Sequence, residues 1–330
     1  MLSPTTRGRS GFTLIEVLVV VTVIGLLVAL LLPAVQASRE SARRATCQAH
    51  LHQIGLAVQS HEAAHQALPA LYNGEFLPQP RTALDEFHFH SWRTMILPQV
   101  EQSSVFASLN LAAPATVPAN QTGLNVGLAL FLCPSTRRPR PTVPDIFEWN
   151  DGAIPVVKVG TAARSDYEAV GGVQVERQTG SSADLSIVRF GAWGEPTYDK
   201  ANGHALRYRK ARLADVTDGL SNTILVGERA GRPDLYRRGK PVDPYPYSKP
   251  GEGTDHHQAA WALSTHFWWI VFWKDQPVNA TNGTGIFSFH PGGANVALAD
   301  GSVRFLKDST TPAVLTGLAT RSGSEAVATE

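Results

Sequence analysis

The chain has 330 residues, and its 29 basic and 28 acidic side chains leave a net charge of +1. This length is enough for one large domain or two ordinary ones, and the balanced charge argues against nucleic-acid binding, which needs clustered positive charge. The two cysteines, Cys47 and Cys133, are too few for a disulfide scaffold and lack the spacing of a structural zinc motif.

An apolar segment lies close to the N-terminus. Residues 12–35 contain one ionisable side chain, Glu16, and as a helix they would span about 36 Å, enough to cross a bilayer core of about 30 Å. Basic residues flank the segment equally, so they do not set its orientation. A cleavable secretory signal ending near residues 35–37 is the alternative, but a carboxylate near mid-membrane costs about 2.5 to 3.5 kcal/mol and has no use in such a signal.

The residues at the start of this segment read GFTLIE, with Gly11, Phe12 and Glu16 directly before the apolar run. This pattern resembles type IV prepilins and type II secretion pseudopilins. The resemblance implies cleavage between Gly11 and Phe12 by a prepilin peptidase, methylation of Phe12, and pairing of Glu16 with the Phe12 amine of a neighbouring subunit. It also implies a single-pass protein of the inner membrane with a cytoplasmic N-terminus and a periplasmic or extracellular head.

The helical pattern continues past the apolar segment to Leu68, with a bend expected at Pro33. One helical stripe, predicted to face the head, consists of Cys47, Leu51, Ile54, Val58, His61, His65 and Leu68. The opposite face is polar, is predicted to be solvated, and consists of Gln48, His52, Gln59 and Glu62. The stripe directs Cys47 into the head, so in an oxidising compartment a disulfide to Cys133 and a free pair are both open.

Residues 61–65 read HEAAH, which is the pattern of a zinc-hydrolase helix. His61 and His65 would share the zinc ion and Glu62 would activate water. However, Glu62 points about 100° away from the histidine stripe. The nearest residues that could supply a third ligand belong to no recognisable motif, and they are Glu75, Asp85, Glu86, His88 and His90. We therefore interpret the two histidines as core-packing residues, with zinc hydrolysis as the alternative.

The rest of the chain predicts a head of short helices, loops and strands. Residues 134–152 are rich in proline and arginine and predict an exposed connection. Apolar runs punctuated by Gly, Asp-Gly and Pro-Gly predict antiparallel strands within residues 166–172, 213–231 and 283–306. Residues 261–273 hold four Trp and two Phe and predict a core segment, with an exposed binding platform as the alternative.

Towards the C-terminus, His290 is followed after nine residues by Asp300 and Gly301. A strand over residues 294–299, about 20 Å long, would separate His290 from Asp300, so they cannot form a catalytic pair. We expect Gly292 or Gly293 and Gly301 to supply positive φ angles, and Asp300 to hydrogen-bond its own turn.

The His290, Asp300 and Gly301 pattern resembles the C-terminal signature of large prepilin-like proteins abundant in planctomycetes, catalogued as domain of unknown function 1559. Further matching stretches are Cys47 with LHQIGLA, then SWRTMILPQVEQ, FLCPS and TDGLSNTILVGE. The chain departs from the family in two places, since QAH follows Cys47 where the family usually has asparagines, and Thr136 replaces an aspartate. The resemblance covers most of the chain and implies little about biochemistry.

The segment LADVTDGLSNT offers Asp215, Asp218 and Asn222 as calcium ligands, and some pseudopilin heads bind calcium. Its spacing is not that of an EF-hand loop, so a calcium site is only an alternative. The chain contains neither a GxSxG motif nor a phosphate-binding glycine loop. No cofactor is therefore predicted.

The predicted fold class is α+β, with a long bent N-terminal helix, transmembrane in its first half, packed on an enlarged head with an antiparallel β-sheet. The predicted parts are a leader (1–11), a transmembrane helix (12–35), its amphipathic extension (36–68), and a head (69–330) ending in a β-meander. We predict a non-catalytic pseudopilin of a type II secretion or type IV pilus-like structure, whose partners are the prepilin peptidase and other pilin subunits. The alternatives are a membrane-tethered module binding a secreted substrate or surface ligand, and the zinc hydrolase.

Overall fold

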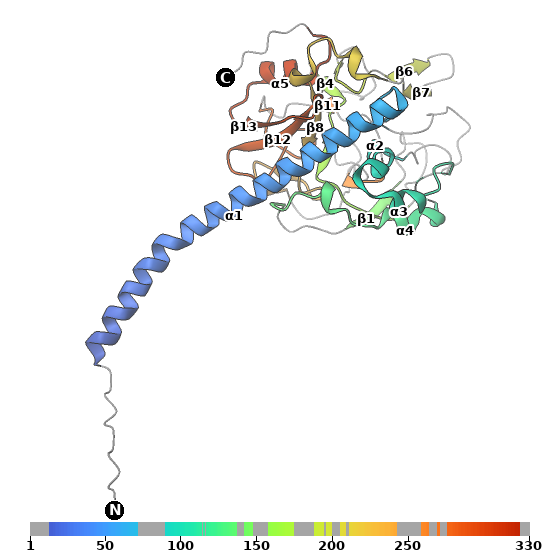
Figure 1. The fold of residues 1–330 in the computed structure, drawn as a ribbon. Helices are drawn as coiled ribbons and strands as arrows, with labels where there is room; N and C mark the ends of the chain where they lie inside the picture. The colour runs from blue at the N-terminus through green and yellow to red at the C-terminus, as the bar shows by residue number, and fades with distance from the viewer. Residues whose placement is uncertain are drawn as a thin grey trace, which may run out of the picture. The chain divides into compact units, whose positions relative to one another are not determined.

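The structure is a computed structural model of the whole chain (Figure 1). It describes residues 13–71, 90–113, 115, 117–136, 142–147, 158–174, 188–194, 196–199, 205–208, 211–242, 259–263, 269–270 and 276–323. The chain forms two compact units, Met1–Arg43 and Arg44–Glu330. Helix α1, Leu14–His65, contributes residues to both units.

Helix α1 is continuous through Pro33 and ends three residues before the predicted end at Leu68. The chain leaves the helix at Gln66, whose φ of 55° lies in the left-handed region that commonly terminates helices. Leu68 then donates its backbone N–H to the carbonyl of Ala211, 2.8 Å away. The long apolar N-terminal helix is confirmed, and a bend at Pro33 stays a prediction.

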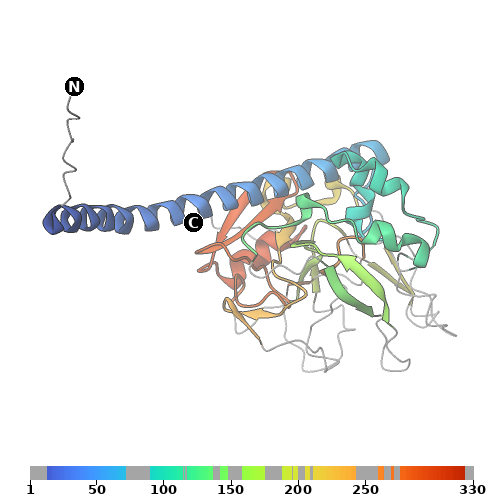
Figure 2. The same cartoon turned by 90° about the horizontal axis from the view of Figure 1, so that it is seen from below.

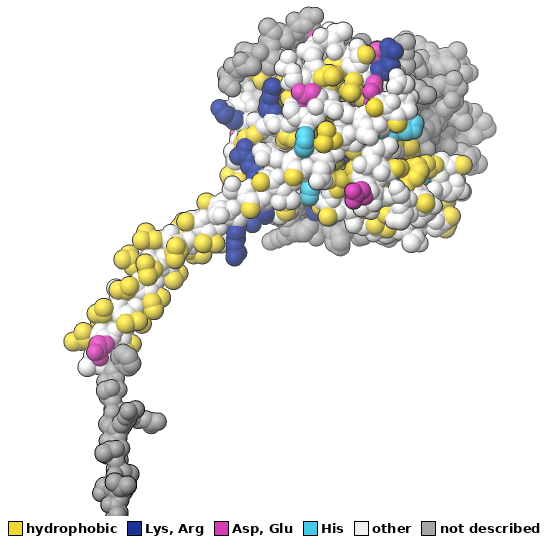
Figure 3. All heavy atoms as spheres, viewed as in Figure 1, with side chains coloured by type: hydrophobic (Ala, Val, Ile, Leu, Met, Phe, Trp, Pro, Cys, Tyr) yellow, Lys and Arg dark blue, Asp and Glu magenta, His cyan; other side chains and the backbone are white. Residues whose placement is uncertain are grey.

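In the first unit, α1 exposes its apolar side chains. Every residue from Leu14 to Arg39 is exposed, and Figure 3 shows hydrophobic side chains covering this part of the helix. The segment is long and apolar enough to cross a membrane. Exposed leucine, isoleucine and valine side chains at this density need an apolar surrounding to avoid contact with water.

In the second unit, the predicted stripe of α1 packs into the core up to Val58. Cys47, Leu51, Ile54 and Val58 are all fully buried. The stripe then leaves the core, because His61 is half-buried and His65 is exposed. The prediction that His65 faces the head is therefore wrong, since the helix ends at this residue and its side chain is exposed.

The polar face of α1 was predicted to be solvated, but three of its side chains contact the C-terminal part of the chain. Gln48 Nε2 donates to Asn295 Oδ1 over 3.3 Å, and Gln59 Nε2 donates to the carbonyl oxygen of Ala299 over 3.1 Å. His52 Nδ1 lies 2.8 Å from the carbonyl oxygen of Gly301. Figure 2 shows α1 running alongside the red C-terminal segment that carries these partners. The periodicity of α1 alone could not reveal that a segment 240 or more residues later covers this face.

The central sheet of the head has four antiparallel strands in the order β13-β12-β8-β3. Its strands are β3 (Tyr167–Ala169), β8 (Ile224–Glu228), β12 (Gly293–Leu298) and β13 (Val303–Lys307). All residues of β8 and β12 are buried, as expected for central strands covered on both faces. The predicted antiparallel sheet is confirmed, and β12 lies within one residue of the predicted strand.

Smaller sheets complete the described strands. β1 (Thr142–Phe147) pairs with β2 (Lys158–Ala163), β6 (Pro196–Asp199) with β7 (Ala205–Tyr208), and β9 (Tyr236–Arg237) with β10 (Lys240–Pro241). β4 (Gly172–Gln174) pairs with β5 (Val188–Phe190) and, in parallel, with β11 (Trp269–Ile270). Strand β1 lies in the predicted exposed connection. Residues 142–147 therefore form a paired strand, where the sequence predicts a connection without regular structure.

Short helices occupy the region after α1. They are α2 (Trp92–Met95), η1 (Leu97–Val100), α3 (Ser103–Ala107), η2 (Pro118–Asn120), α4 (Gln121–Leu124), η3 (Ala129–Phe131), η5 (Leu213–Asp215) and η6 (Leu220–Asn222). The 3-10 helix η1, which contains Pro98, separates α2 from α3. A last helix, α5 (Pro312–Ala319), was not predicted, and Thr311 caps it by accepting from the N–H of Val314.

The core of the head has two clusters. The larger one surrounds the buried face of α1 and contains Trp92, Trp193 and Trp261. The indole N–H groups of Trp193 and Trp261 donate to the carbonyl oxygens of Leu225 and Val126, so neither leaves a buried donor unpaired. The smaller cluster joins the sheet to α5 and includes Ile224, Val296, Leu315 and Leu318.

Candidate functional site

The exposed apolar helix begins at a capping box. Thr13 donates its backbone N–H and its hydroxyl to Glu16 Oε2, both over 2.8 Å. The Glu16 N–H lies 3.3 Å from Thr13 Oγ1. This reciprocal arrangement satisfies two of the unpaired donors at a helix start. Glu16 therefore has a partner within its own chain, which the sequence analysis missed although the T-x-x-E pattern was visible. Gly11 and Phe12 lie outside the described residues.

The histidines of the HEAAH segment stack on each other. Their ring centroids are 4.1 Å apart with an interplanar angle of 20°. His65 Nδ1 lies 3.0 Å from the carbonyl oxygen of His61. Burial, and then the charge of His65, lower the pKa of His61. Within the described parts of the chain, no cluster of three metal-binding side chains includes either histidine. Of the suggested third ligands, only His90 is described, and it is buried against the carbonyl oxygens of Asn110 and Ala113.

The two cysteines meet in the core, 86 residues apart in the chain. Cys47 lies on α1 and Cys133 follows η3, and both side chains are buried. Their sulfur atoms are 2.9 Å apart and are not joined by a disulfide. The expected proximity is therefore found, while the disulfide itself stays a prediction.

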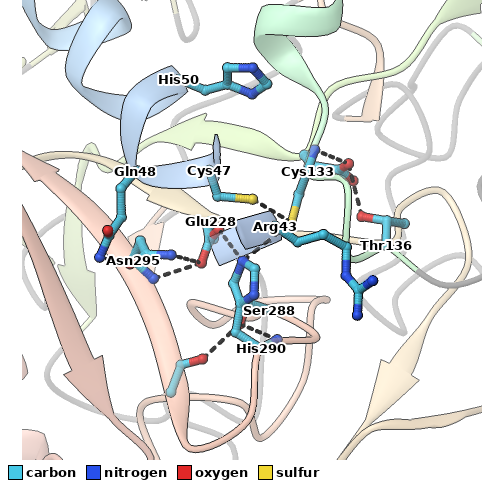
Figure 4. A network of polar contacts seen from close by, with 12 residues as sticks. Arg43, Cys47, Gln48, His50, Cys133, Thr136, Glu228, Ser288, His290 and Asn295 are labelled. Carbon is cyan, nitrogen blue, oxygen red and sulfur yellow. Dashed lines mark hydrogen bonds and ion pairs between the residues drawn. The ribbon is translucent and has the colours of Figure 1, made fainter. Parts of the chain in front are cut away.

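A glutamate and a histidine join the cysteines. Cys133 Sγ lies 3.6 Å from His290 Nε2, and this nitrogen lies 3.3 Å from Glu228 Oε1. Figure 4 shows the four side chains pointing toward one another. One potential ligand atom from each of the four residues lies within 4.8 Å of the others. The chain thus gathers two thiols, a carboxylate and an imidazole at one buried point.

Hydrogen bonds fix the carboxylate and the histidine in place. Glu228 Oε2 accepts from the backbone N–H of Asn295 over 2.6 Å and from its Nδ2 over 3.3 Å. The backbone N–H of His290 donates to Ser288 Oγ, whose hydroxyl donates to the carbonyl of Gly293 over 2.7 Å. Strand β12 and the turn before it therefore position both groups.

Electrostatics at this point are strongly perturbed. Burial opposes a charge on His290, but its contacts with Cys133 and Glu228 outweigh burial and raise its pKa to about 11. The contact with Cys47, followed by burial, raises the pKa of the Cys133 thiol well above its usual value. Burial is also the main cause that raises the pKa of Tyr167. Without another positive charge, the arrangement favours a neutral Cys133 thiol beside a protonated His290.

The Cys133 loop is held by a buried carboxylate. Asp166 Oδ2 accepts from the Cys133 N–H over 2.8 Å and from the Thr136 hydroxyl over 2.9 Å. Asp166 Oδ1 accepts from the Gly231 N–H over 3.0 Å and pairs with Arg164 Nη1 at 2.5 Å. Asp166 thereby ties the segment carrying Cys133 to the segment that follows Glu228.

The remaining residues of the predicted C-terminal motif make a turn, as expected. Asp300 is exposed, and its Oδ1 accepts from the N–H of Ser302 over 2.9 Å and from its hydroxyl over 2.6 Å. Gly292 and Gly301 adopt φ angles of 84° and 82°. His290 is different, because it lies at the cysteine pair and not in the Asp300 turn.

The calcium candidates have other partners. Asp215 Oδ1 pairs with Arg212 Nη2 at 3.0 Å, and Asp218 Oδ2 accepts from the N–H of Gly323 over 2.6 Å. Asn222 Nδ2 lies 3.4 Å from the carbonyl oxygen of Asp218. These contacts belong to capping and turn structure, and among the described residues Asp215 and Asp218 join no cluster of metal-binding groups.

The aromatic segment is described in part. Trp261 is fully buried and stacks on Phe131 with ring centroids 6.1 Å apart, and Ile270 is buried too. These two residues fit the predicted core segment and not the exposed platform. Residues 264–268 and 271–275 lie outside the description.

Glu228 is the site residue that the sequence analysis did not single out. It ends the stretch TDGLSNTILVGE, which was noted as a family resemblance only. An acidic residue that ends an otherwise apolar buried strand was the available signal, because such a charge needs a partner.

A long exposed apolar helix near the N-terminus that continues into an α+β head is typical of the class of prepilin-like proteins. The model of the prokaryotic N-terminal methylation motif matches residues 6–32 and supports this class. The chain belongs to the family described as protein of unknown function (DUF1559), whose model matches residues 36–313. The two resemblances found in the sequence are thus confirmed, while the C-terminal signature stays a prediction. Comparisons with curated proteins and with solved structures gave no match.

Proposed function

We propose that this protein is a non-catalytic pilin-like subunit, a pseudopilin, that assembles through its apolar helix into a type II secretion or type IV pilus-like structure. The observation that carries the proposal is the apolar segment of α1, which is exposed throughout and is covered by the methylation-motif model up to residue 32. A helix that is apolar all round is stable in a membrane or packed among similar helices. The helix would lie in the membrane before assembly and would pack among the helices of other subunits after it.

Processing would take place at the start of α1. A prepilin peptidase would cleave between Gly11 and Phe12 on the cytoplasmic side of the inner membrane, and Phe12 would then be methylated. The protein before assembly would be single-pass, with its head in the periplasm. Glu16, five residues into the processed chain, would meet the Phe12 amine of a neighbouring subunit, which supplies a partner for a carboxylate in an apolar surrounding.

The processing step can be tested directly. The full chain is expressed in a bacterium that has a prepilin peptidase, and the purified protein is analysed by intact mass and N-terminal sequencing. We expect a mature chain starting at methylated Phe12. A chain starting at Ser38 would indicate a secretory signal and would refute the proposal.

A pair of variants isolates the cleavage site. In Gly11→Val, a bulky side chain stands at the scissile bond, so we expect the unprocessed chain to accumulate. Gly8→Val places the same substitution three residues upstream in the leader and should be processed normally. Equal processing of both variants would contradict cleavage after Gly11.

A further inference from the structure

Four buried side chains of metal-binding types converge from four segments of the chain. Cys47 comes from α1, Cys133 follows η3, Glu228 ends β8, and His290 precedes β12. Their potential ligand atoms all lie within 4.8 Å of one another (Figure 4). We propose that these four residues bind one zinc ion in a closed structural site.

The distances among these atoms resemble the edges of a zinc tetrahedron. With Zn–S near 2.3 Å and Zn–N or Zn–O near 2.0 Å, a tetrahedron separates sulfur from nitrogen by about 3.5 Å and nitrogen from oxygen by about 3.3 Å. Cys133 Sγ lies 3.6 Å from His290 Nε2, which lies 3.3 Å from Glu228 Oε1. The two sulfur atoms, 2.9 Å apart, would have to separate to about 3.8 Å. A modest χ1 rotation of one cysteine supplies this movement.

The carboxylate has an oxygen that needs a partner. Glu228 is fully buried, and although its Oε1 lies 3.3 Å from His290 Nε2, no hydrogen bond from the described residues reaches this oxygen. The other oxygen, Oε2, is held by Asn295. A buried carboxylate oxygen whose contact is this long is weakly satisfied, whereas a bound cation would satisfy it fully. The orientation of Glu228 is thus set while its ligand atom stays available.

The set of ligands indicates the metal and its role. Two thiolates and an imidazole favour zinc over calcium or magnesium, which prefer oxygen ligands. Four protein ligands complete a tetrahedron and leave no position for a substrate or an activated water. All four side chains are buried, so the zinc ion would join α1 to three segments of the head. The site is therefore structural and differs from the HEAAH hydrolase centre.

A disulfide between Cys47 and Cys133 competes for the same sulfur atoms. It would consume both thiols and leave Glu228 Oε1 with only its 3.3 Å contact to His290 Nε2, whereas zinc uses all four groups at once. This difference favours zinc. The proposal is independent of filament assembly, because every ligand lies in the Arg44–Glu330 unit, so the unprocessed chain should bind zinc as well.

The test is metal analysis of the full chain, purified anaerobically in detergent without chelators. We expect about one zinc ion per chain, and both cysteines available for alkylation once the protein is unfolded without reductant in the presence of a chelator. Cys133→Ser and His290→Ala should each lose bound zinc. His65→Ala, which removes an exposed histidine, is the matched control and should retain zinc. Asn295→Ala, which removes a side chain that holds Glu228, should weaken zinc binding by about 10- to 100-fold.

A spectroscopic measurement on the wild-type protein tests the proposal without variants, which could fail to fold. Wild-type protein stripped of metal under reducing conditions is titrated with Co²⁺, and we expect the visible bands of tetrahedral cobalt together with a thiolate-to-cobalt charge-transfer band. Wild-type protein without zinc, whether its cysteines are bridged or free, would overturn the proposal. So would zinc retained by Cys133→Ser or His290→Ala, or cobalt bound without thiolate bands.

Discussion

At the scale of single residues, two glycines let the C-terminal turn approach α1. Gly55 is buried on the helix, and a Cβ atom built on it would lie 3.0 Å from the Cα atom of Gly301. Gly301 itself has a φ of 82°, where other residues are strained. The carbonyl of Gly301 also contacts His52. The Asp300 and Gly301 pair of the motif therefore serves the docking of the turn on the helix.

The substitution Gly55→Ala tests this contact. In an exposed helix, replacing glycine by alanine stabilises by about 1 kcal/mol, but here the new methyl group meets backbone that cannot yield easily. We expect the free energy of unfolding to fall by about 1 to 3 kcal/mol. Urea denaturation of the full chain in detergent, followed by tryptophan fluorescence, measures the change.

Gly127→Ala is the control, because a Cβ atom at this exposed position has no neighbour within 4 Å. We expect its effect to stay within about 0.5 kcal/mol. If Gly55→Ala proved as stable as the wild type, the close packing of α1 on the turn would be disproved.

At the scale of elements, the start of α1 gives Glu16 two separate uses. Its carboxylate caps the helix through Thr13 in the single chain, and the proposed filament pairs it with a neighbouring Phe12 amine. Capping needs a hydrogen-bond acceptor, whereas pairing with an amine needs the negative charge. The two uses can therefore be separated by substitution.

Glu16→Gln keeps an acceptor oxygen for Thr13 and removes the charge, and Glu16→Ala removes both. If Glu16 pairs with the amine, we expect both variants to enter the membrane and both to fall about tenfold or more in sheared filaments, since breaking a buried ion pair is costly. Immunoblots of membrane and filament fractions give the ratio.

Thr22→Ala provides the control for this experiment. Its hydroxyl donates to the carbonyl of Leu18 within the same helix, so incorporation should match that of the wild type. Normal incorporation of Glu16→Gln together with loss of Glu16→Ala would assign Glu16 to capping alone.

At the scale of the whole molecule, the features that could be predicted from the sequence rest on local patterns. The apolar run with one carboxylate predicts α1, and the Pro-Gly and Asp-Gly punctuation predicts β12 and its flanking turns to within a residue. Each of these patterns is contained in one short segment, so it can be recognised without knowing how distant segments pack together.

The candidate site could not be predicted in the same way, because its residues come from positions 47, 133, 228 and 290. Spacing shows no zinc motif, and only tertiary packing brings Glu228 and His290 to the cysteines. The exposure of His65 and the contacts of the polar face of α1 were not predicted for a similar reason. The helical period shows which residues share a face of a helix, but it does not show which segments cover that face.

Buried histidines should make the stability of the head depend on pH. Burial is the main cause that lowers the pKa of His50, His61 and His90 below 6.5. The unfolded chain then binds more protons than the folded chain below pH 6.5, so stability falls as the pH falls through this range. The buried His90 contributes up to about 1.4 kcal/mol per pH unit until its folded pKa is reached, and the half-buried His50 and His61 contribute less because solvent screens them.

His90→Gln isolates one of these contributions. His90 is 1 % exposed, and its Nε2 lies 3.2 Å from the carbonyl oxygens of Asn110 and Ala113. A glutamine amide can donate to the same oxygens but does not titrate. Between pH 7 and pH 5.5, the wild type should lose more stability than His90→Gln in urea denaturation. His65→Gln, at an exposed position, should follow the wild type. Equal losses in all three proteins would show that burial of His90 does not control its protonation.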